Sequence, residues 1–128
     1  MALDYGAART GVAISDATGT LARPVTVVER AVTQAGLRRL VELVAAEQAE
    51  QIVVGLPLTL RGARGHQAEE TERFVEALRS AVAVPVERFD ERFTTTLASR
   101  DPAAKAPEDA RAAAHLLETY LAWMANRP

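Results

Sequence analysis

Short apolar stretches separated by turn-forming residues occupy the first thirty positions, which is a pattern typical of short β-strands. We predict three short strands there, over residues 2–6, 11–15 and 21–28. Asp16-Ala17-Thr18-Gly19, between the second and third strands, has the residue types of a tight turn. Pro24 lacks a backbone N–H and places the third strand at a sheet edge or at a bulge. Short connections of this kind predict an antiparallel meander.

Beyond residue 30, the apolar residues recur at the 3.6-residue spacing of α-helices. Thr33 is placed to cap the first helix. Further helices are predicted around residues 74–81 and from about Pro107 onwards. Two strands lie between these helices: the continuous apolar run over residues 51–55, typical of a strand buried on both faces, and residues 84–90.

The predicted order of elements is therefore β-β-β-α-β-α-β-α-α. This order predicts an α/β fold with a mixed five-stranded sheet, an antiparallel meander followed by parallel strands, and helices on both faces. The arrangement is ribonuclease H-like, with a central first strand whose residues face a cleft. At 128 residues, the whole chain, 1–128, is expected to form a single domain.

The composition indicates a globular protein but does not identify its function. The chain is 48% hydrophobic, and its net charge of −2 does not by itself indicate a nucleic-acid-binding protein. It has no cysteine, which excludes disulfides and thiolate metal sites. No apolar run approaches the ~20 residues needed to cross a membrane, and the first residues do not resemble a signal peptide. We therefore expect a cytoplasmic protein with no membrane partner.

Three groups of acidic residues are candidates for chemistry. Asp4 lies in an otherwise apolar strand, where a charged carboxylate is costly unless it is paired or bound to metal. Asp90 and Glu91 close the last strand, at the sheet edge where open α/β proteins bind ligands. Because side chains alternate along a strand, only one of these two should face Asp4 directly. Asp109 lies in the first turn of the last helix, on the border of its inward face.

Each group also has a purely structural explanation when it is taken singly. Asp4 could belong to a turn, Asp90 and Glu91 could pair with nearby arginines, and acids in a first helical turn complement the helix dipole. If the three groups converge, their oxygens suit Mg²⁺ or Mn²⁺. Two such ions can activate water and stabilise the leaving oxygen of a phosphodiester.

Several stretches together resemble one protein family. They are Asp4-Tyr5-Gly6 with Arg9, Gly11-Val12-Ala13 and Ser15-Asp16, residues 52–58 (IVVGLPL), Asp90-Glu91-Arg92-Phe93-Thr94-Thr95, and Asp109 through Leu121. These stretches resemble the motifs of the YqgF proteins, also called RuvX, which are described both as pre-16S rRNA nucleases and as Holliday junction resolvases. The resemblance covers nearly the whole chain, with the motifs in the family's order.

The resemblance implies a ribonuclease H-like nuclease of the bacterial cytoplasm, dependent on Mg²⁺ or Mn²⁺, that acts on the 5′ end of the 16S rRNA precursor. By motif, Asp4, Glu91 and Asp109 would be the catalytic, metal-binding acids, and Asp90 an auxiliary metal ligand. The residues expected to contact nucleic acid are Arg9, Arg61, Arg64, Arg92 and Lys105.

Two features depart from the family's pattern. Family members usually carry several more residues before the first-strand aspartate, so we expect the natural start to lie upstream of Met1. The segment between Thr94 and Asp109 is shorter than usual and holds few basic residues. Because that segment should border the cleft, we expect the grip on substrate to differ.

Three other functions remain open from the sequence. A Holliday junction resolvase acting on branched DNA would require a homodimer, because it cuts two strands symmetrically. Asp4, Gly6 and the following small-residue hairpin also resemble the phosphate loop of sugar-kinase and actin-like ATPases, although 128 residues cannot supply their second lobe. A non-catalytic, nucleic-acid-binding assembly factor is the third alternative.

Overall fold

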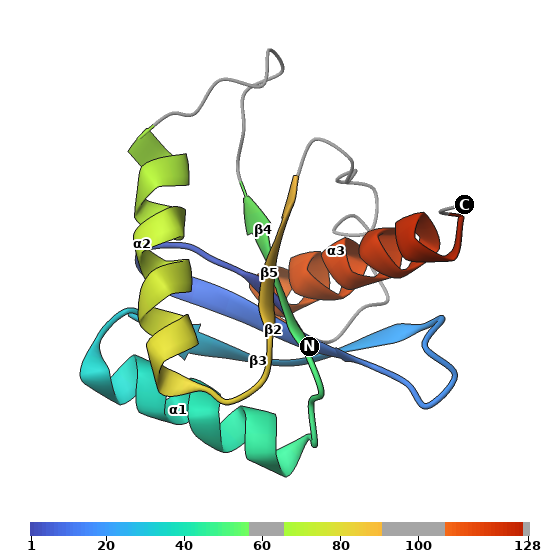
Figure 1. Cartoon of the computed structure of the whole chain (residues 1–128), viewed down its shortest axis with the longest axis horizontal. Coiled ribbons are helices and arrows are strands. Elements are labelled where there is room, and N and C mark those ends of the chain that lie inside the picture. The colour runs from blue at the N-terminus through green and yellow to red at the C-terminus, as the bar shows by residue number, and fades with distance from the viewer. Residues whose placement is uncertain (57–65, 91–106, 127–128) are drawn as a thin grey trace.

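The computed structural model describes residues 1–56, 66–90 and 107–126, which form a sheet with helices packed on it (Figure 1). The strands are β1 (Ala2–Asp4), β2 (Arg9–Ser15), β3 (Ala22–Glu29), β4 (Ile52–Leu56) and β5 (Val86–Asp90). The helices are α1 (Gln34–Ala46), α2 (His66–Ala81) and α3 (Glu108–Ala125). None of these helices is long and apolar enough to cross a membrane.

The five strands form one mixed sheet in the order β3-β2-β1-β4-β5, so β1 is central. β1, β2 and β3 pair antiparallel, and β4 runs parallel to both β1 and β5. The predicted meander followed by parallel strands is confirmed. β3 is an edge strand with an irregular register, because Val12 pairs with Thr26 whereas Ala13 pairs with Pro24. Pro24 was expected at an edge or a bulge, and both features are present.

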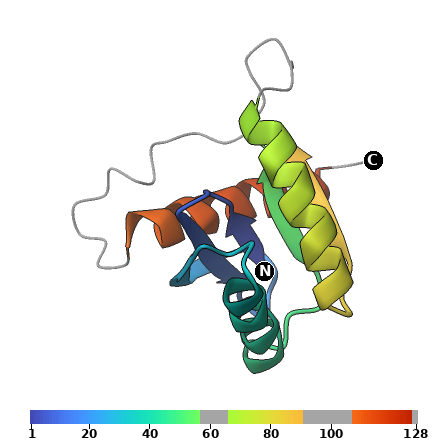
Figure 2. The same cartoon turned by 90° about the vertical axis from the view of Figure 1, so that its left-hand side faces the viewer.

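Helices cover both faces of the sheet, as predicted (Figure 2). α1 and α2 pack on one face, around the fully buried side chains of Leu3, Leu40 and Phe74. α3 packs on the other face, against Ala2, Ala13, Val53 and Phe89. Consecutive β1 residues belong to different cores, which follows from the alternation of side chains along a strand. We name the two sides the α2 face and the α3 face.

Local sequence signals account for two of these elements. The Thr33 hydroxyl accepts a hydrogen bond from the Gly36 N–H at 3.1 Å and caps α1, as predicted. All five residues of β4 are buried, as expected for a strand covered on both faces.

Some predicted boundaries differ from the structure. β1 ends at Asp4 rather than at residue 6, because Tyr5 and Gly6 enter the turn to β2. There the Gly6 carbonyl accepts a hydrogen bond from the buried Thr10 hydroxyl at 3.4 Å. β5 begins at Val86 rather than at residue 84. α3 is one of the two helices predicted after the last strand, and residues 91–106, where the other would have to lie, fall outside the described residues.

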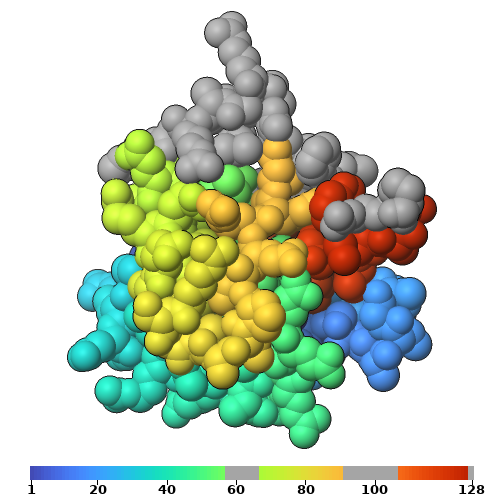
Figure 3. Space-filling model, viewed as in Figure 1, coloured from blue at the N-terminus to red at the C-terminus, as the bar shows by residue number. Residues whose placement is uncertain are grey.

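β5 and α2 together form much of the surface seen in the space-filling view, and the C-terminal part of α3 lies beside β5 (Figure 3). The ring of Phe89 in β5 contacts that part of α3, with its centroid 5.4 Å from Tyr120 and 5.5 Å from Trp123. These contacts fix the C-terminal half of α3 at the edge of the sheet. The N-terminal half of the same helix crosses β1 and β2, where the acids lie.

Candidate functional site

Asp4 is the last residue of the central strand. Its backbone pairs with Gly11 of β2, while the preceding residue, Leu3, pairs with Val54 of β4. Ala2 packs in the core on the α3 face and Leu3 packs in the core on the α2 face. Alternation therefore places the half-buried Asp4 side chain on the α3 face, on a strand held from both sides.

Tyr5 supports Asp4 from the opposite face of the sheet. Its ring stacks on Phe74 of α2, with the centroids 4.4 Å apart and the planes 18° from parallel. Partial burial raises the pKa of the Tyr5 phenol, and Glu70 adds to the rise while Arg73 opposes it. The phenol is therefore uncharged at neutral pH, and its ring anchors the end of β1.

Gly11 allows the beginning of α3 to approach the sheet. A Cβ atom at this position would collide with the backbone carbonyl of Asp109, so any side chain here would push the first turn of α3 away. Gly11 is also the residue paired with Asp4 across the β1–β2 ladder. The first turn of α3, which carries Asp109, therefore packs on the residue that pairs with Asp4, on the same face of the sheet.

Arg9 begins β2, two residues before Gly11, and so lies on the same face of the strand. Its Nε is 3.4 Å from Oδ2 of Asp109. Both side chains are open to solvent, with exposed fractions of 66% for Arg9 and 39% for Asp109. The predicted nucleic-acid contact Arg9 is therefore an ion-pair partner of the predicted catalytic acid Asp109.

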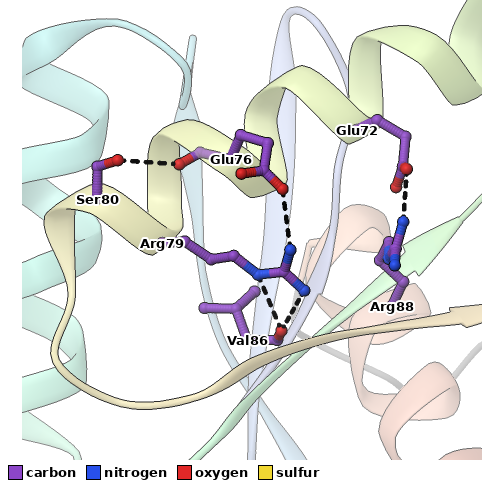
Figure 4. Close-up of polar contacts among 6 residues, drawn as sticks. All are labelled: Glu72, Glu76, Arg79, Ser80, Val86 and Arg88. Atoms are coloured by element: carbon purple, nitrogen blue, oxygen red, sulfur yellow. Dashed lines mark hydrogen bonds and ion pairs between the residues drawn. The ribbon is translucent and has the colours of Figure 1, made fainter.

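The contacts of the β5 side chains show which face of the sheet each of them points to. Arg88 donates a hydrogen bond to Glu72 of α2, so it points to the α2 face (Figure 4). Glu87 accepts a hydrogen bond from the Tyr120 hydroxyl of α3 at 2.8 Å, so it points to the α3 face. Alternation then places Asp90 on the α2 face with Arg88, on the side of the sheet opposite Asp4.

The structure brings together only part of the predicted site. Arg9 and Asp109 are in contact on the α3 face, which also bears Asp4, while alternation places Asp90 on the other side of the sheet. Within residues 1–56, 66–90 and 107–126, no three acidic or histidine side chains are grouped closely enough to hold a metal ion. Five predicted site residues fall outside the described residues and stay predictions: Arg61, Arg64, Glu91, Arg92 and Lys105.

The donors at this site fit a hard divalent cation. Asp4 and Asp109 both offer carboxylate oxygens, the ligands that Mg²⁺ prefers. Mg²⁺ is usually held by one or two carboxylates together with substrate phosphates rather than by a complete protein cage. Two carboxylates beside an exposed arginine therefore suit a metal ion that also contacts a phosphate.

Two features of the site were not predicted from the sequence. Gly11 was noted as part of a motif, yet its role in admitting α3 depends on a residue 98 positions away in the chain. A glycine inside a strand is, however, a known sign of close backbone approach. The Arg9–Asp109 ion pair has no local signal, because it joins residues from two different elements.

A hollow of about 590 Å³ lies at the other end of the sheet. It is bordered by the turn between β2 and β3 and by the segment that leads from α1 to β4. Its lining includes neither Asp4 nor Asp109. We therefore place the candidate chemistry at the acids and not at this hollow.

Comparison with known proteins identifies the family of the chain. The family model described as "RuvX: Holliday junction resolvase" matches residues 1–123. The chain belongs to the RuvX family. A relative from Chloroflexus aurantiacus named "Putative pre-16S rRNA nuclease" is 43% identical over 129 residues, covering 94% of this chain and 84% of that protein. A relative of the same name from Moorella thermoacetica is 43% identical over 100 residues, covering 78% and 71%.

Among solved structures, this RuvX-family chain is similar to T. thermophilus RuvC in complex with a Holliday junction substrate. The TM-score is 0.60 at 19% identity, and the match covers 97% of this chain and 94% of RuvC. At that identity the likeness shows the fold alone. It confirms the ribonuclease H-like α/β arrangement predicted from the order of elements.

Proposed function

We propose that this RuvX-family chain is a divalent-metal-dependent nuclease that hydrolyses phosphodiester bonds and processes the 5′ end of pre-16S rRNA. The observation that supports the proposal is the close packing of the first turn of α3, which carries Asp109, on Gly11, the residue that pairs with Asp4. Family membership and the names of the relatives support the same function.

Asp4 and Asp109 are the residues that would hold the metal. When bound, Mg²⁺ or Mn²⁺ lowers the pKa of water and stabilises the charge that develops on the phosphodiester. The chain's part is to fix the carboxylates: Asp4 by strands on either side, and Asp109 by the helix turn packed on Gly11. We propose Glu91 as the third acid in preference to Asp90, because alternation along β5 turns Asp90 to the α2 face.

We propose Arg9 as a contact to the substrate. Its side chain is 66% exposed beside Asp109, and the planar guanidinium suits bidentate contact with a phosphate. We propose Arg61, Arg64, Arg92 and Lys105 as further phosphate contacts on the basis of the motif resemblance. Structured RNA is the substrate class that agrees with the relatives' names.

A second candidate function is resolution of Holliday junctions. It is favoured by the description of the matching family and by the junction-bound RuvC that shares the fold. A resolvase makes two symmetric cuts, so this function requires a homodimer with two sites.

The first prediction concerns Asp4→Asn, which keeps the side-chain size and removes the charge. We expect the rate of RNA cleavage to fall at least about a hundredfold, because a bound metal contributes several kcal/mol to such reactions. The substrates are a labelled RNA with the 5′ leader of 16S rRNA and a synthetic four-way DNA junction, each with Mn²⁺ or Mg²⁺. Asp16→Asn is the matched control, because Asp16 lies in the exposed turn after β2.

Each outcome of this assay has a distinct meaning. Asp4-dependent cleavage of the RNA alone supports the processing nuclease, whereas paired symmetric nicks in the junction support the resolvase. Full activity of Asp4→Asn, at matched purity, would contradict both functions. Cleavage of neither substrate by the unaltered chain would leave the non-catalytic assembly factor as the better account.

A further inference from the structure

The ion pair between Arg9 and Asp109 joins a proposed phosphate contact to a proposed metal ligand. Arg9 Nε lies 3.4 Å from Asp109 Oδ2, at the point where the first turn of α3 packs on Gly11. A guanidinium carries one positive charge, and the proposed metal ion carries two. Both cations are therefore directed to the same carboxylate.

We propose that Arg9 is a displaceable counterion: it pairs with Asp109 while the metal is absent, and the divalent ion releases it to bind a phosphate of the substrate. This inference rests on the proposed function, because it requires Asp109 to be a metal ligand. Beyond the proposed function, it states that the Arg9 guanidinium and the metal ion compete for the Asp109 carboxylate.

The geometry of the pair favours displacement. A strong charge-assisted N–H···O contact measures about 2.7–2.9 Å, and the Arg9–Asp109 distance of 3.4 Å is clearly longer. Exposed fractions of 66% and 39% leave both groups hydrated, and exposed ion pairs of this kind contribute little stability. A divalent ion on Asp109 would attract the carboxylate more strongly and would repel the guanidinium at the same time.

The position of Arg9 on β2 also favours its proposed contact with a phosphate of the substrate. Arg9, Gly11 and Ala13 alternate along β2 and share the face that bears Asp4 and α3. A guanidinium released from Asp109 would remain on this face, beside the metal and exposed to solvent. A phosphate held by the metal would then lie within the region that the arginine fork can reach.

Displacement predicts opposite effects on two ligands when the Arg9 charge is removed. Arg9→Gln should bind Mn²⁺ more tightly, because a competing cation is gone. The same variant should bind RNA more weakly, because a phosphate contact is lost. Removal of an Arg9 that never leaves Asp109 would raise Mn²⁺ affinity through the lost charge alone and would leave RNA binding unchanged. Removal of a simple phosphate contact would weaken RNA binding equally with and without Mn²⁺.

Isothermal titration of Mn²⁺ into the protein without nucleic acid tests the first effect and needs no catalytic activity. We expect Arg9→Gln to bind Mn²⁺ about threefold to tenfold more tightly than the unaltered chain, as expected for removing one nearby charge in a largely hydrated site. Arg9→Lys keeps the charge and should stay near the unaltered value. The matched control is Arg23→Gln, because Arg23 is 63% exposed, also forms an ion pair, and lies near the opposite end of the β2–β3 ribbon.

Fluorescence anisotropy with a phosphorothioate analogue of the RNA leader tests the second effect. In Mn²⁺, Arg9→Gln should weaken RNA binding about threefold to tenfold, as expected for one lost phosphate contact. Without Mn²⁺ the loss should be smaller, because Arg9 is then engaged by Asp109. Arg23→Gln should match the unaltered chain in both conditions.

The two titrations separate failure of this inference from failure of the proposed function. Asp4-dependent Mn²⁺ binding that Arg9→Gln leaves unchanged or weakens would overturn the displacement and leave the metal site in place. An equal loss of RNA affinity with and without Mn²⁺ would overturn it as well. If the unaltered chain binds no Mn²⁺, both the inference and the proposed metal site are wrong.

Discussion

The α2 face and the region around the start of α3 are packed with side chains of different size. On the α2 face, Leu40, Phe74 and Leu78 are completely buried and fill the space between helix and strands. On the α3 face, where the helix crosses β1 and β2, the facing residues are Ala2, Gly11 and Ala13, and α3 contributes Ala110 and Ala113. Large side chains hold a helix at a distance, whereas small ones allow its backbone to touch the sheet.

Because of this difference in packing, the two regions should contribute differently to stability and to metal binding. The α2 face buries larger apolar side chains than the region around the start of α3, and apolar burial is the dominant favourable term in folding. Small residues on the α3 face bury less apolar area, and they place the Asp109 backbone against Gly11. Substitutions on the α2 face should therefore reduce stability, and substitutions under the start of α3 should reduce metal binding and activity.

The largest expected effect on stability comes from Leu78→Ala on the α2 face. Leu78 has no exposed surface, so the substitution should lower the free energy of unfolding by about 2–5 kcal/mol, measured in urea. Folded protein should keep its Mn²⁺ affinity, because Leu78 does not belong to the core under α3. A loss of Mn²⁺ affinity comparable to that of Asp4→Asn would show that the two faces are not separable.

Gly11→Ala should have a smaller effect on stability and a large effect on function. The added methyl meets the Asp109 carbonyl, and overpacking of this kind costs about 1–3 kcal/mol. Cleavage should fall about a hundredfold, because shifts of about 1 Å in a catalytic group have effects of that size. Gly19→Ala is the control: Gly19 has φ +70° but nothing within 4 Å of an added Cβ. It should lose stability through strain and keep its activity, and equal activity of both variants would contradict the role of Gly11.

Thr33→Ala on the α2 face should have the smallest effect on stability of these three variants. Loss of the N-cap hydrogen bond to Gly36 should reduce stability by about 1 kcal/mol, as judged from urea unfolding. α1 packs on the α2 face, so Mn²⁺ binding and RNA cleavage should remain at the level of the unaltered chain. Lower activity in the folded variant would indicate that α1 also positions the site.

The elements that could be predicted are those specified by neighbouring residues. The cap at Thr33, the doubly covered strand β4 and the irregular edge strand at Pro24 each follow from local chemistry, and the structure has all three. The last residue of β1 and the first residue of β5 differ from the prediction, because a strand extends only as far as its partners pair with it. For β1 that point depends on how the chain turns at Gly6 and Thr10, which its own apolar pattern does not specify.

The residues of the candidate site also differ in whether the sequence could predict them. Asp4 was recognisable because a carboxylate inside an apolar strand is costly unless it is paired or bound. Asp109, taken singly, had a sufficient structural explanation in the first turn of a helix, and only the resemblance to the family made it a predicted catalytic acid. The distinction between Asp90 and Glu91 required knowing which face of β5 meets α2, which the Arg88–Glu72 contact supplies (Figure 4). The meeting of Asp109 with Gly11 joins segments far apart in the chain, and no local pattern encodes it.

The most direct test of the proposed metal site is an anomalous difference map from a crystal of the protein soaked in Mn²⁺. We expect a peak on the α3 face, about 2.0–2.2 Å from carboxylate oxygens of both Asp4 and Asp109, the range expected for small divalent ions bound by oxygen. A peak elsewhere, or crystals that bind Mn²⁺ at neither acid, would contradict the claim that the approach of α3 to Gly11 builds a metal site.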